Sequence, residues 1–119
     1  MTITDNRQPS TVILINKDGM GQAESGLQHK VLRTYLTLLL ENGALPGAIC
    51  LYTAGVKLVC EGSPVLEQLV ELEERGVHLI VCLTCLKHYE LESQVKVGVV
   101  GGMADIIAAQ WQADKVITI

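Results

Sequence analysis

The sequence predicts a three-layer α/β/α sandwich, in which helices cover both faces of a mainly parallel, five-stranded sheet. Two observations lead to this fold class. Short apolar segments rich in β-branched residues alternate with amphipathic segments along the chain, and the connections between them are short. The apolar segments are also continuous, as expected for strands that are covered on both faces. Right-handed crossovers then favour a doubly wound arrangement over nearly all other topologies.

The composition fits one domain with its own core. The chain has 119 residues, of which 49% are hydrophobic and 18% are charged. A chain of this size buries roughly two-thirds of the surface that its unfolded form exposes. Residues 1–10 are polar and predict a flexible lead-in, whereas residues 11–119 predict a single domain.

Strands and helices are predicted in alternation. The strands are expected at residues 11–15, 48–53, 77–82, 95–100 and 115–119, and the helices at 24–41, 63–75 and 103–112, with a short one after the third strand. Ser63 and Pro64 are typical of a helix start, and Gly76 is typical of the residue after a helix end. Gly98 interrupts the fourth strand.

The first helix is predicted from apolar residues at helical spacing over residues 24–41. Glu24 lies in its first turn and Asn42-Gly43 at its end, where such residues are expected. Leu38 widens the apolar face of this helix. Either a contact with another subunit or a wide core-facing stripe would explain that width.

In a parallel sheet, the loops that follow the strands gather along one edge, and ligands bind there. Four segments are therefore expected at this edge: Asp18 to Gly21, Ala54 to Gly62, Cys82 to Cys85, and Gly101-Gly102. Glycine recurs in these loops because the backbone must turn sharply or approach a neighbour closely. The cysteine pair lies among them.

Cys82 and Cys85 form a Cys-x-x-Cys pair at the turn from the third strand into a short helix. With Thr84 as the cap, Cys85 is the first helical residue, and free backbone N–H groups there favour a lowered thiol pKa. His88 follows on the same helical face and is placed to stabilise a thiolate. Cys82 is close enough to resolve a mixed disulfide or persulfide, or else it is a small core hydrophobe. We predict catalytic roles for Cys85, Cys82 and His88.

A zinc site is the competing interpretation of the same residues. Cys82, Cys85 and His88 have ligand spacing, but structural zinc sites take a fourth ligand, usually from a second pair. Cys60 is the only other candidate at this edge, and Cys50 falls inside a strand. We therefore predict neither a metal nor a cofactor.

The loop from Asp18 to Gly21 lacks both glycine-rich phosphate-binding patterns, and its acidic residue opposes an anion. His29 and His78 have no obvious partners and are interpreted as structural. The net charge of −4 argues against nucleic acid and anionic membranes as partners. The absence of a visible secretory signal in residues 1–10 favours the reducing cytoplasm.

Four segments carry a resemblance to a known family: Gly55-Val-Lys-Leu58, Glu61-Gly-Ser-Pro-Val-Leu66, Cys82-Leu-Thr-Cys85-Leu86 and Ala113-Asp-Lys-Val-Ile-Thr-Ile119. Together with the order of strands and helices, they resemble the DsrE family over residues 11–119. The match is closest to the DsrE-like domain of selenium-metabolism proteins of the YedF type.

The resemblance implies a cytoplasmic sulfur-relay protein that carries a persulfide on Cys85 and assembles as a homo-oligomer, such as a trimer or hexamer. YedF-type proteins often carry a TusA-like domain with a Cys-Pro-x-Pro motif, and this sequence contains no such motif. A TusA-like or other donor protein would then act in trans, and sulfur is favoured over selenium.

Two functions from different classes follow. The first is a sulfur carrier or sulfurtransferase that uses Cys85. The alternative is a non-catalytic oligomeric binding module that holds a small anion or a nucleotide at its glycine-lined edge.

Overall fold

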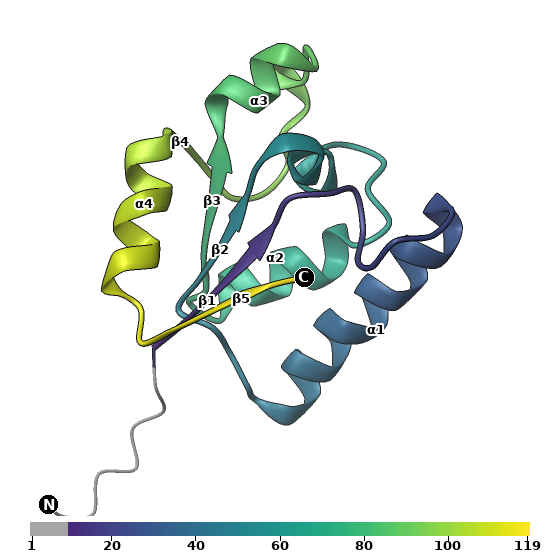
Figure 1. Cartoon of the computed structure of the whole chain (residues 1–119). Helices are drawn as coiled ribbons and strands as arrows, with labels where there is room; N and C mark the ends of the chain where they lie inside the picture. The colour runs from purple at the N-terminus through teal and green to yellow at the C-terminus, as the bar shows by residue number, and fades with distance from the viewer. Residues whose placement is uncertain (1–9) are drawn as a thin grey trace, which may run out of the picture.

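A five-stranded sheet forms the middle layer of the protein in the computed structural model, which describes residues 10–119 (Figure 1). The strands are β1 (Thr11–Ile15), β2 (Ala48–Leu51), β3 (His78–Cys82), β4 (Val99–Gly101) and β5 (Lys115–Thr118). Their order is β4-β3-β2-β1-β5, and all four pairings are parallel. This confirms the predicted sandwich. The predicted lead-in at residues 1–10 lies, except for Ser10, outside the described residues.

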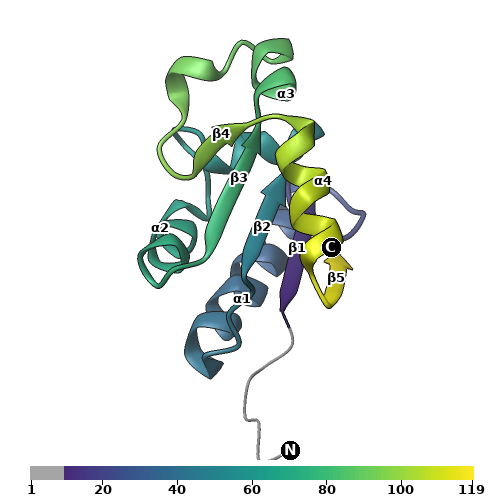
Figure 2. The same ribbon diagram turned by 90° about the vertical axis from the view of Figure 1, so that its left-hand side faces the viewer.

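Helices cover the two faces of the sheet unequally. Helices α1 (Ser25–Asn42) and α2 (Leu66–Glu74) lie side by side on one face, and α4 (Met103–Gln112) lies across the other (Figures 1 and 2). The short helix α3 (Leu83–His88) and the 3₁₀ segments η1 (Thr53–Val59) and η2 (Glu92–Gln94) complete the chain. None of the described helices is long and apolar enough to cross a bilayer.

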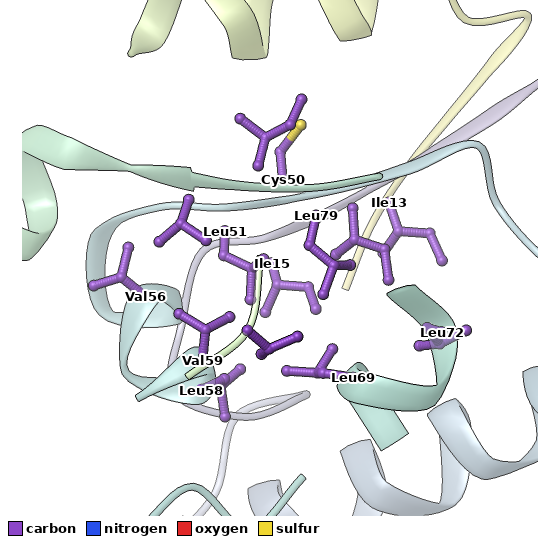
Figure 3. Packing of buried hydrophobic residues seen from close by; sticks show 14 of the residues in the cluster. Ile13, Ile15, Cys50, Leu51, Val56, Leu58, Val59, Leu69, Leu72 and Leu79 are labelled. Carbon is purple, nitrogen blue, oxygen red and sulfur yellow. The ribbon is translucent and has the colours of Figure 1, made fainter. Parts of the chain in front are cut away.

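The main core lies between the sheet and the α1–α2 layer. Figure 3 shows Ile15, Leu51 and Leu79 pointing from the sheet toward α2 and η1, whereas Cys50 points to the opposite face, toward α4. Residues of β2 are buried on both faces, as continuous apolar strands of parallel sheets are. Because side chains alternate along a strand and neighbours in register share a face, Ile80 and Cys82 lie on the same face as Cys50.

The structure corrects the predicted end of the second strand. This strand stops at Leu51 rather than at residue 53, because the chain turns at Tyr52 and enters η1. Thr53 has a φ of +47°, which no strand accommodates. Gly55 in the same turn lies so close to β1 that a Cβ there would come within 2.2 Å of the carbonyl oxygen of Ile15.

Two other boundaries differ from the prediction by more than one residue. Helix α2 begins at Leu66, because Ser63 and Pro64 form a turn before it, in which Ser63 Oγ accepts a hydrogen bond from the N–H of Val65. Strand β4 covers only residues 99–101. Gly98, with a φ of +91°, bends the preceding segment away, and Val95 pairs with Cys60 in an antiparallel bridge.

One point on the carboxyl edge of the sheet, between β3 and β4, differs from the rest of that edge in the direction that the chain takes after each strand. The chain steps from β1 through β4 in one direction, and α4 then carries it back across the other face to β5. The connection after β3 stays on the α2 side, where the N–H of Gly98 donates to Glu73 Oε2. The chain therefore leaves β3 and β4 toward opposite faces, and such a switch point is where ligands bind in open α/β sheets.

Candidate active site

The Cys82–Cys85 pair lies at this switch point, at the carboxyl end of β3. Cys82 is the last residue of β3, opposite Gly101 in the neighbouring strand, and it is also the residue that precedes α3. The chain thus passes from strand to helix without an intervening loop. This corrects the predicted cap: Thr84 lies inside the helix, and Cys85 is its third residue rather than its first.

The two sulfur atoms are in contact but differ in accessibility. Cys85 Sγ lies 3.3 Å from Cys82 Sγ, at hydrogen-bond distance for sulfur. Cys82 is buried, with 2% of its surface exposed, whereas Cys85 is partly exposed at the edge of the core. Solvent and partner thiols therefore reach the pair through Cys85.

The backbone of Thr53 supplies a second contact to Cys85. Its N–H donates a hydrogen bond to Cys85 Sγ at 3.0 Å. The positive φ of a β-branched residue is a strained conformation. The hydroxyl of Thr53 holds this backbone conformation in place, because its Oγ1 lies at hydrogen-bond distance from the carbonyl oxygens of Asn16 and Tyr52. Strain of this kind persists where surrounding contacts over-determine it, and it is common at functional sites.

Thr53 was not among the residues predicted for the site. The sequence predicts Thr53 at the end of a strand, and its residue type gives no sign of a role in a site. The group that meets the sulfur is a backbone N–H, which every residue except proline provides. Only the unusual turn after β2 aims this N–H at Cys85.

The pKa of Cys85 is shifted in the direction opposite to the predicted one. Burial raises the pKa of the Cys85 thiol, and the hydrogen bond and charge interaction with Cys82 raise it further. The hydrogen bond from Thr53 acts in the opposite direction and lowers this pKa, without reversing the net shift. The expected lowering by a helix start is wrong, since α3 has only six residues and Cys85 is not at its first position.

His88 lies outside this cluster of contacts. It is exposed, and its ring meets the ring of Tyr89 edge-on, with centroids 5.1 Å apart. Among the described residues, no hydrogen bond joins His88 to Cys85. Lys57 from η1 instead lies over the ring of Tyr89, with Nζ 4.6 Å from its centroid, so this ring links α3 to η1. The structure thus brings Cys82 and Cys85 together and leaves His88 apart.

Of the other histidines singled out from the sequence, His29 has a side-chain partner. His29, interpreted as lacking one, lies with Nε2 3.2 Å from Asp18 Oδ1. The Asp18 loop is also held by Lys17, whose Nζ donates to the carbonyl oxygen of Gly21. Within residues 10–119, no group of three or more His, Cys, Asp or Glu side chains is arranged to hold a metal ion.

The glycine-lined edge is poorly suited to bind an anion, because carboxylates lie in its loops. At the start of α4, the N–H of Gly102 donates to Asp105 Oδ2 at 2.9 Å, so the carboxylate of the helix itself occupies the place that a phosphate would take. A second glycine loop at this edge carries Asp18. These carboxylates oppose the alternative function of anion or nucleotide binding.

The comparison with family models shows the family, and the comparison with solved structures shows the fold. The model of the DsrE/DsrF-like family matches residues 30–119. Among solved structures, the ychN protein from E. coli aligns with a TM-score of 0.68 at 22% identity, covering 94% of this chain and 100% of that one.

Two further structures share the fold. MTH1491 from Methanobacterium thermoautotrophicum, described as a protein of unknown function, aligns with a TM-score of 0.69 at 17% identity over 94% of this chain and 100% of that one. BT1422 from Bacteroides thetaiotaomicron, described as a conserved protein of unknown function, aligns with a TM-score of 0.65 at 17% identity. The alignment covers 92% of this chain and 95% of that one. Among curated proteins, no match was found.

Proposed function

The chain belongs to the DsrE/DsrF-like family, and on this premise we propose that it is a sulfur carrier or sulfurtransferase in sulfur or selenium metabolism that holds a persulfide on Cys85. One observation carries the proposal: a partly exposed thiol lies at the switch point of the sheet and is contacted by a backbone N–H and a second thiol. Cys85 is the nucleophile, and Cys82 supports it.

The transfer is a thiol exchange. The Cys85 thiolate attacks the outer sulfur of a persulfide on the donor, the bond between the two donor sulfurs breaks, and the donor leaves as a thiolate. The N–H of Thr53 points at Cys85 Sγ and favours the thiolate form during the attack. A thiol with a raised pKa forms less thiolate at neutral pH, but each thiolate is the stronger nucleophile.

The relay requires partners. A TusA-like or other persulfide protein acts as the donor in trans, and an acceptor thiol takes the sulfur from Cys85. Free thiols are maintained in a reducing compartment, so we place the protein in the cytoplasm. No nucleic acid or membrane takes part.

The protein also associates with itself, and α4 is the surface that supports this part of the proposal. Met103, Ile107 and Trp111 form an apolar stripe along this helix, with exposed fractions of 51%, 47% and 82%. The only charged residue of α4, Asp105, is engaged at its own helix start. Val99 on the adjoining edge strand β4 extends the stripe.

A second copy of this chain fits the α4–β4 surface better than a transient partner does. Permanent interfaces between identical subunits are more apolar than those of transient complexes, which keep charged residues. A helix that is apolar around most of its surface is normally buried. We therefore assign this surface to a homo-oligomer, such as a trimer or hexamer.

Intact-mass measurement tests the carrier function. The reduced, purified chain is incubated with inorganic polysulfide as the sulfur source, and a gain of about 32 Da is expected on Cys85. The Cys85→Ser variant is expected to gain nothing, whereas the Cys60→Ser variant is expected to react like the wild type, since Cys60 is buried with its thiol bonded to the carbonyl of Val56. Equal adducts on wild type and Cys85→Ser would disprove the role of Cys85.

A further inference from the structure

We propose that Cys82 releases the sulfur held by Cys85 as hydrosulfide, by attacking the inner sulfur of the persulfide and leaving a Cys82–Cys85 disulfide. The inference rests on the proposed function, since it needs a persulfide on Cys85, and it adds a reductive activity to the transfer. A carrier with a lone thiol can only pass its sulfur to an acceptor. This dithiol can also discharge sulfur by itself.

The geometry places the attacking and attacked atoms together before any reaction. The sulfurs lie 3.3 Å apart, which is within the distance of a near-attack arrangement. A disulfide bond is about 2.0 Å long, so the sulfurs need to approach by only about 1.3 Å. The residues are three apart across a strand-to-helix junction, and rotation of the two side chains supplies such a movement.

The difference in burial between the two cysteines indicates which one accepts the sulfur from a donor and which one later attacks it. Cys85 is partly exposed and can meet a donor protein, whereas Cys82, with 2% of its surface exposed, cannot. A persulfide held by Cys85 is therefore placed within reach of the Cys82 thiol. Because Cys82 is shielded from external oxidants and disulfides, its thiol is kept for the internal reaction.

The step balances in atoms and electrons. Cys82 Sγ forms a bond to Cys85 Sγ, and the bond between Cys85 Sγ and the outer sulfur breaks. The electron pair of the broken bond leaves with the outer sulfur, which takes the proton of the Cys82 thiol and departs as HS⁻. The outer sulfur is reduced, and the two cysteines are oxidised to a disulfide. An external dithiol, the co-reactant that thiol–disulfide exchange requires, returns the pair to its reduced form.

The contact from Thr53 is compatible with this step. Its N–H donates to Cys85 Sγ, which is the inner sulfur of the persulfide. A donor at this atom withdraws electron density and fixes its position, so the inner sulfur is held toward Cys82. The outer sulfur then points to the open side of Cys85, from which hydrosulfide leaves.

The test follows one loaded sulfur under anaerobic conditions without reductant. The full-length chain is loaded with inorganic polysulfide, desalted, and followed by intact mass and by sulfide assay. The wild type is expected to lose the adduct of about 32 Da, to end about 2 Da lighter than the reduced chain, and to release one equivalent of sulfide. The Cys82→Ala variant is expected to keep its adduct at least about tenfold longer, because the internal nucleophile is missing.

Two further variants serve as controls. Cys50→Ala removes a buried thiol on the same face of the sheet, from a strand position away from Cys85, and is expected to behave like the wild type. Cys82→Ser, which keeps nearly the same volume, replaces Cys82→Ala if the latter does not fold. Persistence of the adduct in the wild type for as long as in the Cys82 variants would overturn the inference, as would equal sulfide release from them. If no variant takes up sulfur and the wild type keeps its reduced mass, the carrier function itself has failed.

Discussion

At the scale of single residues, the site depends on two groups that contact the sulfur atom of Cys85. Cys85 Sγ receives the N–H of Thr53 and lies against Cys82 Sγ. Burial and Cys82 raise the pKa of Cys85, whereas Thr53 lowers it. The reactivity of Cys85 in the reduced protein is therefore set by its neighbours rather than by the helix that carries it.

Removal of Cys82 is expected to make Cys85 react faster at neutral pH. The Cys82→Ala variant lacks both the hydrogen bond and the charge interaction that raise the pKa of Cys85. The pKa of Cys85 then falls, and a larger fraction is thiolate at pH 7. The rate of alkylation by iodoacetamide, measured by mass spectrometry between pH 6 and 10, gives the titration curve. A curve that shifts to higher pH in Cys82→Ala would contradict this account.

A second residue-scale prediction concerns Cys50, whose burial raises its pKa to about 11. The folded state keeps this thiol protonated at a pH where the unfolded chain loses the proton, so the stabilisation is complete below pH 9 and is lost as the pH rises toward 11. Between pH 8 and 10.5, the wild type is expected to lose about 2 kcal/mol more of its free energy of unfolding than Cys50→Ala does. Urea denaturation of both proteins measures the difference. Equal losses would show that Cys50 does not titrate in this way.

At the scale of elements, the turn from β2 into η1 positions the backbone donor. Gly55 lets this turn pack directly on the carbonyl of Ile15 at the end of β1. The same packing brings the Thr53 hydroxyl to Asn16 and thereby aims the Thr53 N–H at Cys85. The ends of β1 and β2 thus determine a contact made to the helix that follows β3.

The Gly55→Ala substitution is expected to destabilise the protein and to disturb Cys85. A Cβ at this position would lie 2.2 Å from a backbone oxygen, and such overpacking typically costs about 1–3 kcal/mol. The expected results are a lower urea midpoint and a changed alkylation rate of Cys85. Gly26→Ala is the matched control, since Gly26 lies in the first turn of α1 with open space around it. It is expected to leave Cys85 unchanged and to stabilise the helix by about 0.5–1 kcal/mol.

The same elements explain which parts of the fold were predictable. Strand β1 and helix α4 have the predicted bounds because their hydrophobic pattern is local. The cysteine pair was also predictable, since its spacing and its place after a strand are sequence features. The Thr53 contact was not, because it involves a backbone group whose direction depends on the packing of Gly55 against β1. The start of α2 was predicted too early, because Ser63 caps a turn rather than the helix.

At the scale of the whole molecule, unequal coverage of the sheet separates two surfaces. The α1–α2 layer encloses the main core, whereas α4 alone crosses the other face and leaves apolar side chains exposed. Helix α4 starts two residues after Gly101, the residue opposite Cys82 in the sheet. A second copy that covers α4 would therefore lie next to the edge at which the cysteines meet their partners.

A charge on α4 is expected to dissociate the homo-oligomer. Trp111 is 82% exposed in the isolated chain, and burying a large apolar side chain of this kind stabilises an interface by about 1.5–3 kcal/mol. The Trp111→Glu variant loses this stabilisation from apolar burial and also places a carboxylate in an apolar contact. Light scattering coupled to size exclusion is expected to show an oligomer for the wild type and a monomer for this variant, with unchanged circular dichroism.

The matched control for that experiment is Leu38→Glu. Leu38 is also exposed, but on α1, where the charged residue Glu41 lies one turn further along the helix surface. Since Glu41 already places a carboxylate beside Leu38, this surface accepts another one, and the variant is expected to remain oligomeric. Dissociation by Leu38→Glu but not by Trp111→Glu would place the interface on α1, as the width of its apolar face first suggested. A monomeric wild type would remove self-association from the proposal and leave the exposed stripe of α4 to the donor or acceptor protein.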